Sequence, residues 1–106
     1  MSAQIKLAVL VSLTIFTLVP AIAQSPGAET YKAKCQGCHG ATGMADTSVG
    51  KVLKVVPINS PSVKKMSQAA MIDATKNGLG KMQAFKDKLT EEQIKDAVEY
   101  FRSLSK

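Results

Sequence analysis

Apolar residues follow three different patterns along the chain. Residues 7–19 are a nearly continuous apolar run with only mild polar interruptions. Beyond residue 67, apolar positions recur three or four residues apart, the spacing of one helical face. Residues 49–58 fit both a short helix and an extended segment, because periodicity over so few positions does not separate the two. The patterns predict helices joined by loops, which is an all-α fold.

The clearest predicted helix lies at the end of the chain. Thr90 is a typical N-cap, and Gln93 three residues later completes a capping box. The apolar stripe of this helix consists of Ile94, Ala97, Val98, Phe101 and Leu104. Their spacing predicts that one face of the helix is buried.

A first helix is predicted at the start of the domain. Ser25-Pro26 is a typical helix start, and residues 27–36 should then form a helix that Gly37 ends. For residues 49–58 we favour a short helical turn followed by an extended strip that ends at Ile58. Ser60-Pro61 should open another brief turn.

One more helix is predicted between these two. Ser67 is placed to cap a helix over residues 68–77, which Gly78 should end. Residues 78–85 contain too much glycine for a helix and predict a loop.

The N-terminal apolar run has the features of an export signal. Residues 1–6 form a short polar start that carries a positive charge, and residues 21–23 give the small-x-small pattern of a cleavage site. As a helix, about thirteen apolar residues span roughly 20 Å, less than the roughly 30 Å hydrocarbon core of a bilayer. We therefore expect residues 1–23 to be a cleaved signal peptide. The mature domain, residues 24–106, should be periplasmic and have no permanent membrane anchor.

Composition limits how such a small domain is stabilised. The full chain has 106 residues and a net charge of +6, which becomes about +5 once Lys6 is removed with the leader. Domains of this size have a marginal hydrophobic core and commonly recruit a disulfide, a metal or a cofactor. A disulfide between Cys35 and Cys38 would close too short a loop to stabilise the chain. A cofactor is therefore expected to fill the interior.

Both cysteines and the single histidine lie in one motif, Cys35-Gln36-Gly37-Cys38-His39. Three kinds of site have a pattern of this type. A redox dithiol normally follows a strand, and no strand pattern precedes Cys35. A structural zinc site needs four nitrogen or sulfur ligands, and the chain offers three. The third kind, C-x-x-C-H, is the attachment signature of a covalent c-type haem.

Haem chemistry explains the spacing of this motif. Two thiols three residues apart on a helical turn, Cys35 and Cys38, are placed to form thioethers with the two vinyl groups of one porphyrin. His39 then binds the iron from the same side. An exported chain suits this interpretation, since bacteria attach c-type haem outside the cytoplasm. We therefore predict one covalent haem c.

The second axial ligand of the iron has to be a residue other than histidine, because His39 is the only one. Methionine occurs four times in the mature chain. Met44 is close to His39 in sequence and is expected on the same side of the ring, while Met66 and Met71 fit core positions at a helix start. Met82 lies in a glycine-bordered loop and follows no apolar periodicity. We therefore favour Met82 as the ligand.

Over essentially its whole mature length, the chain resembles the class I c-type cytochromes, especially the small bacterial monohaem proteins. Gly27 and Tyr31 match the family's glycine and aromatic pair on the first helix, and Cys-His-Gly-x-x-Gly continues the motif as it often does there. Residues 80–85 are similar to the family's axial methionine loop, and residues 87–94 to the start of its last helix.

The resemblance implies a specific architecture. The N- and C-terminal helices should cross, with shorter helices and loops wrapped around the haem, and Met82 should be the second axial ligand. Gly27 and Tyr31 should then contact a set of residues on the last helix, namely Val98, Phe101 and Leu104.

Two further details of the family concern the ligand loops. The residue after the axial methionine is commonly proline, whereas this chain has Gln83, which leaves the loop less stiff. The family also holds the second ring N–H of the histidine through a backbone carbonyl. We expect the loop around Pro57 to supply that carbonyl.

These expectations define a function. Histidine and methionine together saturate the iron, which suits a single-electron carrier and leaves no open position for an enzyme substrate. The partners should be a redox donor and acceptor with acidic surfaces, docking near Lys81, Lys86 and Lys88, although these lysines equally fit a solvated surface. We expect a monomer that binds no nucleic acid. The alternative is a five-coordinate haem protein that binds or senses a small gas, which requires Met82 to be displaced.

Overall fold

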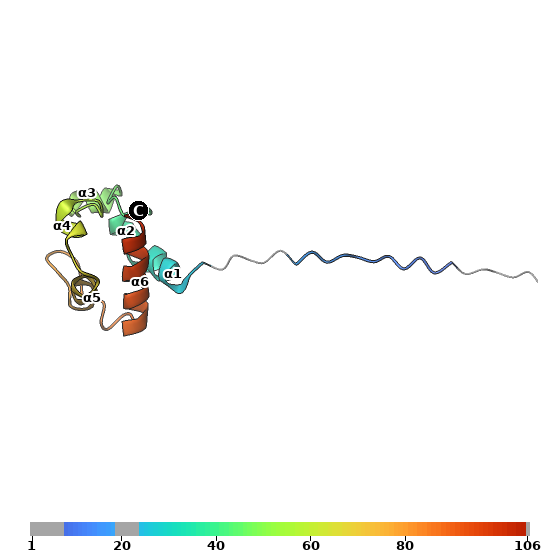
Figure 1. Cartoon of the computed structure of the whole chain (residues 1–106). Coiled ribbons are helices and arrows are strands. Elements are labelled where there is room, and N and C mark those ends of the chain that lie inside the picture. The colour runs from blue at the N-terminus through green and yellow to red at the C-terminus, as the bar shows by residue number, and fades with distance from the viewer. Residues whose placement is uncertain (1–7, 19–23, 106) are drawn as a thin grey trace, which may run out of the picture.

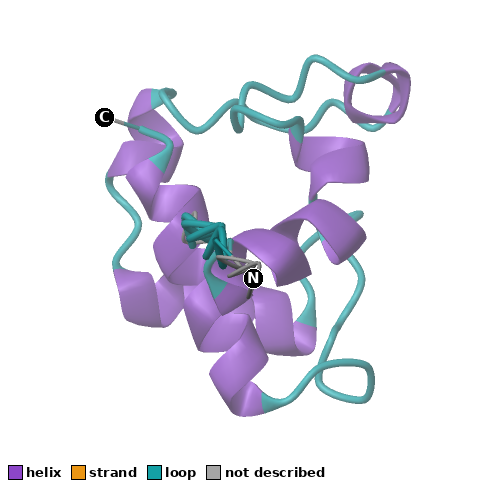
Figure 2. Ribbon diagram, turned by 90° about the vertical axis from the view of Figure 1, so that its right-hand side faces the viewer, coloured by secondary structure: helices purple, strands orange, loops and turns teal. Residues whose placement is uncertain are grey.

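The computed structural model describes residues 8–18 and 24–105. In this part of the chain, all the regular elements are helices (Figures 1 and 2). They are α1 Pro26–Lys34, α2 Gln36–His39, α3 Ser48–Val52, α4 Pro61–Lys64, α5 Gln68–Asn77 and α6 Glu91–Ser103. The predicted all-α class is confirmed.

Residues 8–18 form no regular secondary structure and are exposed; Figure 1 draws them leading away from the helices. No helix among the described residues is long and apolar enough to cross a membrane. The predicted cleavage site at residues 21–23 lies outside the described residues. The signal peptide therefore stays a prediction.

Helices α1 and α6 cross in close contact. Gly27 lies at the crossing, where a Cβ atom would collide with the backbone carbonyl of Asp96. One turn further along α1, the ring of Tyr31 packs on Tyr100 and Phe101 with centroid distances of 5.2 and 5.9 Å. The expected contact of Tyr31 with Phe101 is confirmed. Gly27, however, lies against the backbone of Asp96, a residue outside the predicted set, because the missing side chain lets the two helix backbones approach closely.

The break between α1 and α2 differs from the prediction. Helix α1 ends at Lys34, and the chain bends at Cys35, where φ is −115°. Helix α2 then includes Gly37, so the prediction that this glycine ends the first helix is wrong. Gly40 ends α2 instead, since it adopts φ +82°, a conformation that favours glycine.

The buried face of α6 contributes three residues to the apolar core. Thr90 and Gln93 make both hydrogen bonds of the predicted capping box, at 3.1 and 2.9 Å. Ile94, Ala97 and Val98 are almost fully buried, and Ile94 is only 1% exposed. Burying a side chain such as isoleucine or valine contributes roughly 1.5–3 kcal/mol. The amphipathic pattern thus correctly predicted the inner face.

Helix α5 has the predicted bounds. The Ser67 side chain accepts a hydrogen bond from the Ala70 amide at 3.1 Å, and Gly78 ends the helix with φ +85°. The loop that follows turns back on α5, where the Phe85 amide donates to the Thr75 carbonyl at 2.9 Å. This bond positions the beginning of the connection to α6.

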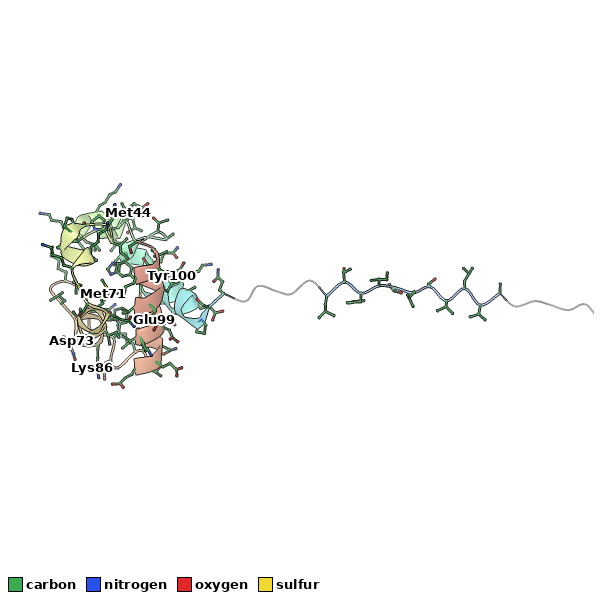
Figure 3. The ribbon with its side chains drawn as sticks, in the orientation of Figure 1. Met44, Met71, Asp73, Lys86, Glu99 and Tyr100 are labelled. Carbon is green, nitrogen blue, oxygen red and sulfur yellow. The ribbon has the colours of Figure 1, made fainter. Side chains whose placement is uncertain are left out.

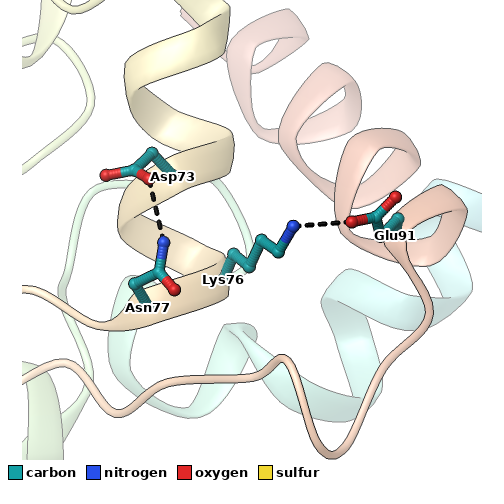
Figure 4. A network of polar contacts seen from close by, with 4 residues as sticks. All are labelled: Asp73, Lys76, Asn77 and Glu91. Atoms are coloured by element: carbon teal, nitrogen blue, oxygen red, sulfur yellow. Dashed lines mark hydrogen bonds and ion pairs between the residues drawn. The ribbon is translucent and has the colours of Figure 1, made fainter.

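A polar network links the end of α5 to the start of α6 (Figure 4). Lys76 Nζ lies 2.6 Å from a carboxylate oxygen of Glu91, and Asn77 donates to Asp73 at 2.9 Å. The hydrogen bond from Lys76 lowers the pKa of Glu91. Both partners are exposed, so the pair contributes little to stability.

Residues 49–58 take the predicted mixed form. A short helix, α3, is followed by a non-helical stretch, and α4 starts at Pro61. The apolar side chains of this region differ in burial: Ile58 is 2% exposed and belongs to the core, whereas Val52 is 76% exposed and Val56 is 47% exposed. The apolar pattern of residues 49–56 is therefore only partly accounted for by burial within the chain.

Replacing Gly27 by alanine tests the α1–α6 crossing. The added methyl group would have to displace the Asp96 backbone, so we expect a loss of about 1–3 kcal/mol in the free energy of unfolding. Guanidinium unfolding of the purified protein measures it. Gly37→Ala is the matched control, since a Cβ there meets nothing within 4 Å. Equal stability of the two variants would contradict the crossing.

Candidate functional site

One cavity of about 570 Å³ contains all four of the predicted site residues. Cys35, Cys38 and His39 line it from the α1–α2 segment, and Met82 lines it from the loop between α5 and α6. This volume falls within the range of small-molecule and cofactor sites. Residues 43 positions apart in sequence are thus brought to a single site.

The cavity walls are mainly apolar. Segments far apart in sequence contribute, including Leu53, Val55 and Val56 after α3 and Val98 and Phe101 of α6. The exposed apolar residue Val56 therefore belongs to this cavity. Among the described residues, no carboxylate lines it, and the charged groups are three lysines, Lys34, Lys54 and Lys81.

The short helix α2 places the three motif side chains on one turn. The Cys35 carbonyl accepts hydrogen bonds from the amides of Cys38 and His39, at 3.2 and 3.0 Å. The Gly40 amide donates to the Gln36 carbonyl at 2.9 Å and closes the turn. These local hydrogen bonds therefore hold Cys35, Cys38 and His39 on the single helical turn that the motif predicts.

Helix α3 packs directly on this turn. The Thr47 hydroxyl donates to the Gly37 carbonyl at 2.7 Å and accepts from the Gly50 amide at 2.9 Å. Gly50 is buried, and a Cβ there would collide with the Cys38 carbonyl. One side chain, Thr47, thus caps α3 and joins it to the motif.

The His39 ring is held by packing. It packs edge-to-face with the Phe101 ring, at a centroid distance of 5.1 Å and an angle of 63°. Burial lowers the pKa of His39, which favours the neutral imidazole that a metal ligand needs. Its Nδ1 atom is buried and has no hydrogen-bond partner in the described part of the chain.

The expectation that the loop around Pro57 binds His39 is therefore wrong. The Pro57 carbonyl instead accepts from the Ser60 amide at 3.0 Å, within its own turn. The next residue, Ile58, donates its amide to the Gly43 carbonyl at 2.8 Å. The loop is thus tied to the segment after the motif and not to the imidazole.

The two thiols are unpaired and half-buried. Burial, and to a smaller extent the neighbouring Cys38, raises the pKa of Cys35 to about 11. A redox dithiol needs a lowered thiol pKa, so this environment disfavours disulfide exchange. Zinc gains no support either, because the described residues contain no group of three or more histidine, cysteine or carboxylate side chains placed to hold a metal.

Three methionines line the cavity: Met66, Met71 and Met82. Met66 and Met71 also line a second cavity of about 570 Å³, so they form the partition between the two. Met71 is 8% exposed and belongs to the core, as predicted. Met44 lies apart, near α3 (Figure 3), and is 39% exposed.

The loop that carries Met82 contains a tight turn. Leu79 and Met82 exchange two backbone hydrogen bonds, of 3.1 and 2.9 Å, with Gly80 at φ +57° between them. The Gln83 side chain accepts a hydrogen bond from Lys88 Nζ at 2.6 Å. These bonds give the loop some of the order that a proline after Met82 would supply.

Comparison with known proteins identifies the family. The model of the family described as cytochrome c oxidase, cbb3-type, subunit III matches residues 23–101. The chain belongs to this family of c-type cytochromes. A solved structure described as the KustC0563 c-type cytochrome is 30% identical, and the match covers 76% of this chain and 98% of that one with a TM-score of 0.68. No curated protein matches the chain.

The cytochrome's cavity meets the requirements of the haem c that such proteins carry. It combines two thiols, an imidazole and a largely apolar wall. The His39 side chain lines this cavity, and its buried Nδ1 atom has no hydrogen-bond partner among the described residues that would tie the ring elsewhere. The residues present therefore fit the group.

Sequence reasoning missed some contributions to this site. The stripe on α6 predicts that Phe101 is buried, but not that its ring meets His39. Thr47 gave no signal at all, because a single threonine in a loop does not show that it bridges two elements. Contacts between segments that are distant in sequence can be identified only once the fold is known.

Replacing Thr47 by valine tests how α3 is joined to the motif. Valine keeps the shape and removes both hydrogen bonds, so we expect a loss of about 1–2 kcal/mol in the free energy of unfolding. Thr47→Ser keeps the hydroxyl and should lose less than half of that amount. Denaturant unfolding of the intact cytochrome measures both. A serine variant as unstable as the valine variant would contradict the hydroxyl's role.

Proposed function

We propose that this cytochrome is a single-electron carrier with one covalent haem, ligated by histidine and methionine. The observation that supports it most is that Cys35, Cys38, His39 and Met82 line the same cavity. Family membership makes electron transfer the general function of the chain. The ligand set and the shuttling role are the parts that we propose.

In this proposal each site residue has one task. Cys35 and Cys38 hold the haem through thioether bonds, and His39 and Met82 are the axial ligands of its iron. When bound, the haem accepts and releases one electron as its iron changes between the ferric and ferrous states. The apolar walls of the cavity would keep water from the haem, and lysines are the charged residues among the lining side chains.

Met82 is the favoured ligand among the three cavity methionines. Met66 and Met71 line both cavities and lie between them, and Met71 is buried in the core. Met82 lines one of these cavities and projects from a turn outside any helix. A methionine ligand raises the reduction potential relative to a second histidine.

Export to the periplasm is also part of the proposal. The N-terminal sequence predicts a cleaved signal, and covalent haem attachment suits a protein that leaves the cytoplasm. A periplasmic carrier would take electrons from one redox protein, its donor, and pass them to another, its acceptor.

Replacing Met82 by alanine tests the ligand set. The purified protein should keep its covalent haem, measured as the pyridine haemochrome, and lose the far-red ferric band that methionine ligation gives. The ferrous variant should bind carbon monoxide readily, because one axial position is then open. Its reduction potential should fall, since the iron loses a ligand that favours the ferrous state.

Met66→Ala is the matched control, because it removes a methionine from the same cavity. It should keep the far-red band. Loss of the band in Met66→Ala but not in Met82→Ala would reassign the ligand. A wild-type protein without the band that binds carbon monoxide would instead favour the five-coordinate gas-binding alternative.

The lysines suggest how partners dock. No acidic residue occurs between Asp46 and Asp73, while this stretch carries four exposed lysines, Lys51, Lys54, Lys64 and Lys65. Helices α3 and α4 bring them to one end of the molecule (Figure 1). The lysines expected from sequence, Lys81, Lys86 and Lys88, are also exposed but have Asp87 among them. We propose that the α3–α4 lysines attract an acidic redox partner most strongly.

Paired charge reversals distinguish the two lysine groups. We expect Lys51→Glu with Lys54→Glu to slow oxidation by an anionic metal complex such as ferricyanide about tenfold at low ionic strength, with a flatter salt dependence. Stopped-flow kinetics measures both effects. The control, Lys81→Glu with Lys86→Glu, changes the net charge by the same amount and keeps the bond from Lys88 to Gln83. If both double variants slow the reaction equally, the rate depends only on the overall charge of the protein. If the control variant slows it more, docking takes place at the Met82 loop.

A further inference from the structure

The hydroxyl of Tyr31 makes a buried hydrogen bond that has no part in the proposed haem attachment or iron ligation. It donates to the Gly40 carbonyl at 2.6 Å, and the residue is 2% exposed. Burial raises the pKa of this hydroxyl far above its ordinary value, so it remains a protonated donor. The acceptor belongs to the residue that directly follows His39.

The backbone after His39 is held from two sides. The His39 carbonyl accepts from the Ala45 amide at 2.8 Å. The Gly40 carbonyl accepts from Tyr31 and from the Gly43 amide, the latter at a longer 3.2 Å. Helix α1 thus supplies the shorter of the two bonds that fix this carbonyl.

The same residue also supports the imidazole through packing. Phe101 lies nearly parallel to the Tyr31 ring, at 5.9 Å and 21°, and it also meets the His39 ring edge-to-face. The Nδ1 atom of His39 has no hydrogen bond within the described residues that could fix the ring directly. Its orientation therefore depends on the neighbouring backbone and on this aromatic packing, and Tyr31 contributes to both.

We propose that Tyr31 is a positioning residue for His39: its hydroxyl, through the Gly40 carbonyl, orients the imidazole and so tunes the redox equilibrium. This inference rests on the proposed function, in which His39 ligates the iron. A less firmly held imidazole donates less to the iron, and a weaker donor favours the ferrous form. Weakening the hydrogen bond should therefore raise the reduction potential.

The first test compares Tyr31→Phe with Tyr100→Phe in the haem-loaded protein. Each removes one phenolic hydroxyl, and in the described part of the chain the Tyr100 hydroxyl makes no hydrogen bond. We expect Tyr31→Phe to shift the redox equilibrium constant at least threefold towards the ferrous form, roughly 30 mV for one electron. Its ferric electron paramagnetic resonance spectrum should change, and Tyr100→Phe should resemble wild type. An unchanged potential and spectrum in Tyr31→Phe would overturn the proposal, even with reduced stability.

A second test avoids removing the bond. In a Tyr100→Phe background, Tyr31 is the only tyrosine, so fluorotyrosine incorporation alters this residue alone. More acidic fluorophenols donate more strongly, and the potential should fall progressively as the acidity rises. The absence of any trend would overturn the role of the hydroxyl. A wild-type protein without haem or without the far-red band would instead contradict the proposed function, so the two failures are distinguishable.

Discussion

The crossing of α1 and α6 determines where the site residues lie. Gly27 admits the Asp96 backbone, and Tyr31 packs on the aromatic residues of α6 one turn later. Because α1 leads directly into the motif, this contact fixes the start of α2. The same α6 surface carries Phe101, which meets His39, so one helix pair supports both the chain and the imidazole.

The remaining elements complete a cavity that the protein itself does not fill. Thr47 joins α3 to the motif, and the turn after α5 brings Met82 to the cavity. Val56 is 47% exposed although it is apolar, and it lines this cavity. A small domain with such a poorly covered core gains stability from a large apolar cofactor. Fold and function are therefore linked, since the group that carries the electron would also complete the core.

Much of this could be predicted from local sequence. The N-cap residues and Gly78 gave the bounds of α5 and the start of α6, because those signals act over a few residues. Gly37 was misjudged, since a glycine ends a helix only where the backbone needs a positive φ, and Gly40 has that conformation. The Pro57 loop was misassigned: Nδ1 of His39 has no hydrogen-bond partner among the described residues, and the Ile58 amide ties the loop to Gly43. Long-range contacts such as Phe101 with His39 depend on the crossing and leave no local trace.

The central claim is that one exported chain carries one haem, bound covalently through Cys35 and Cys38. The intact mass of the mature protein, purified from the periplasm under denaturing conditions, tests it most directly. We expect a single species with the mass of residues 24–106 plus one haem, and the haem should stay attached through the denaturing step. The mass of the polypeptide alone, or of a chain that retains residues 1–23, would contradict the account.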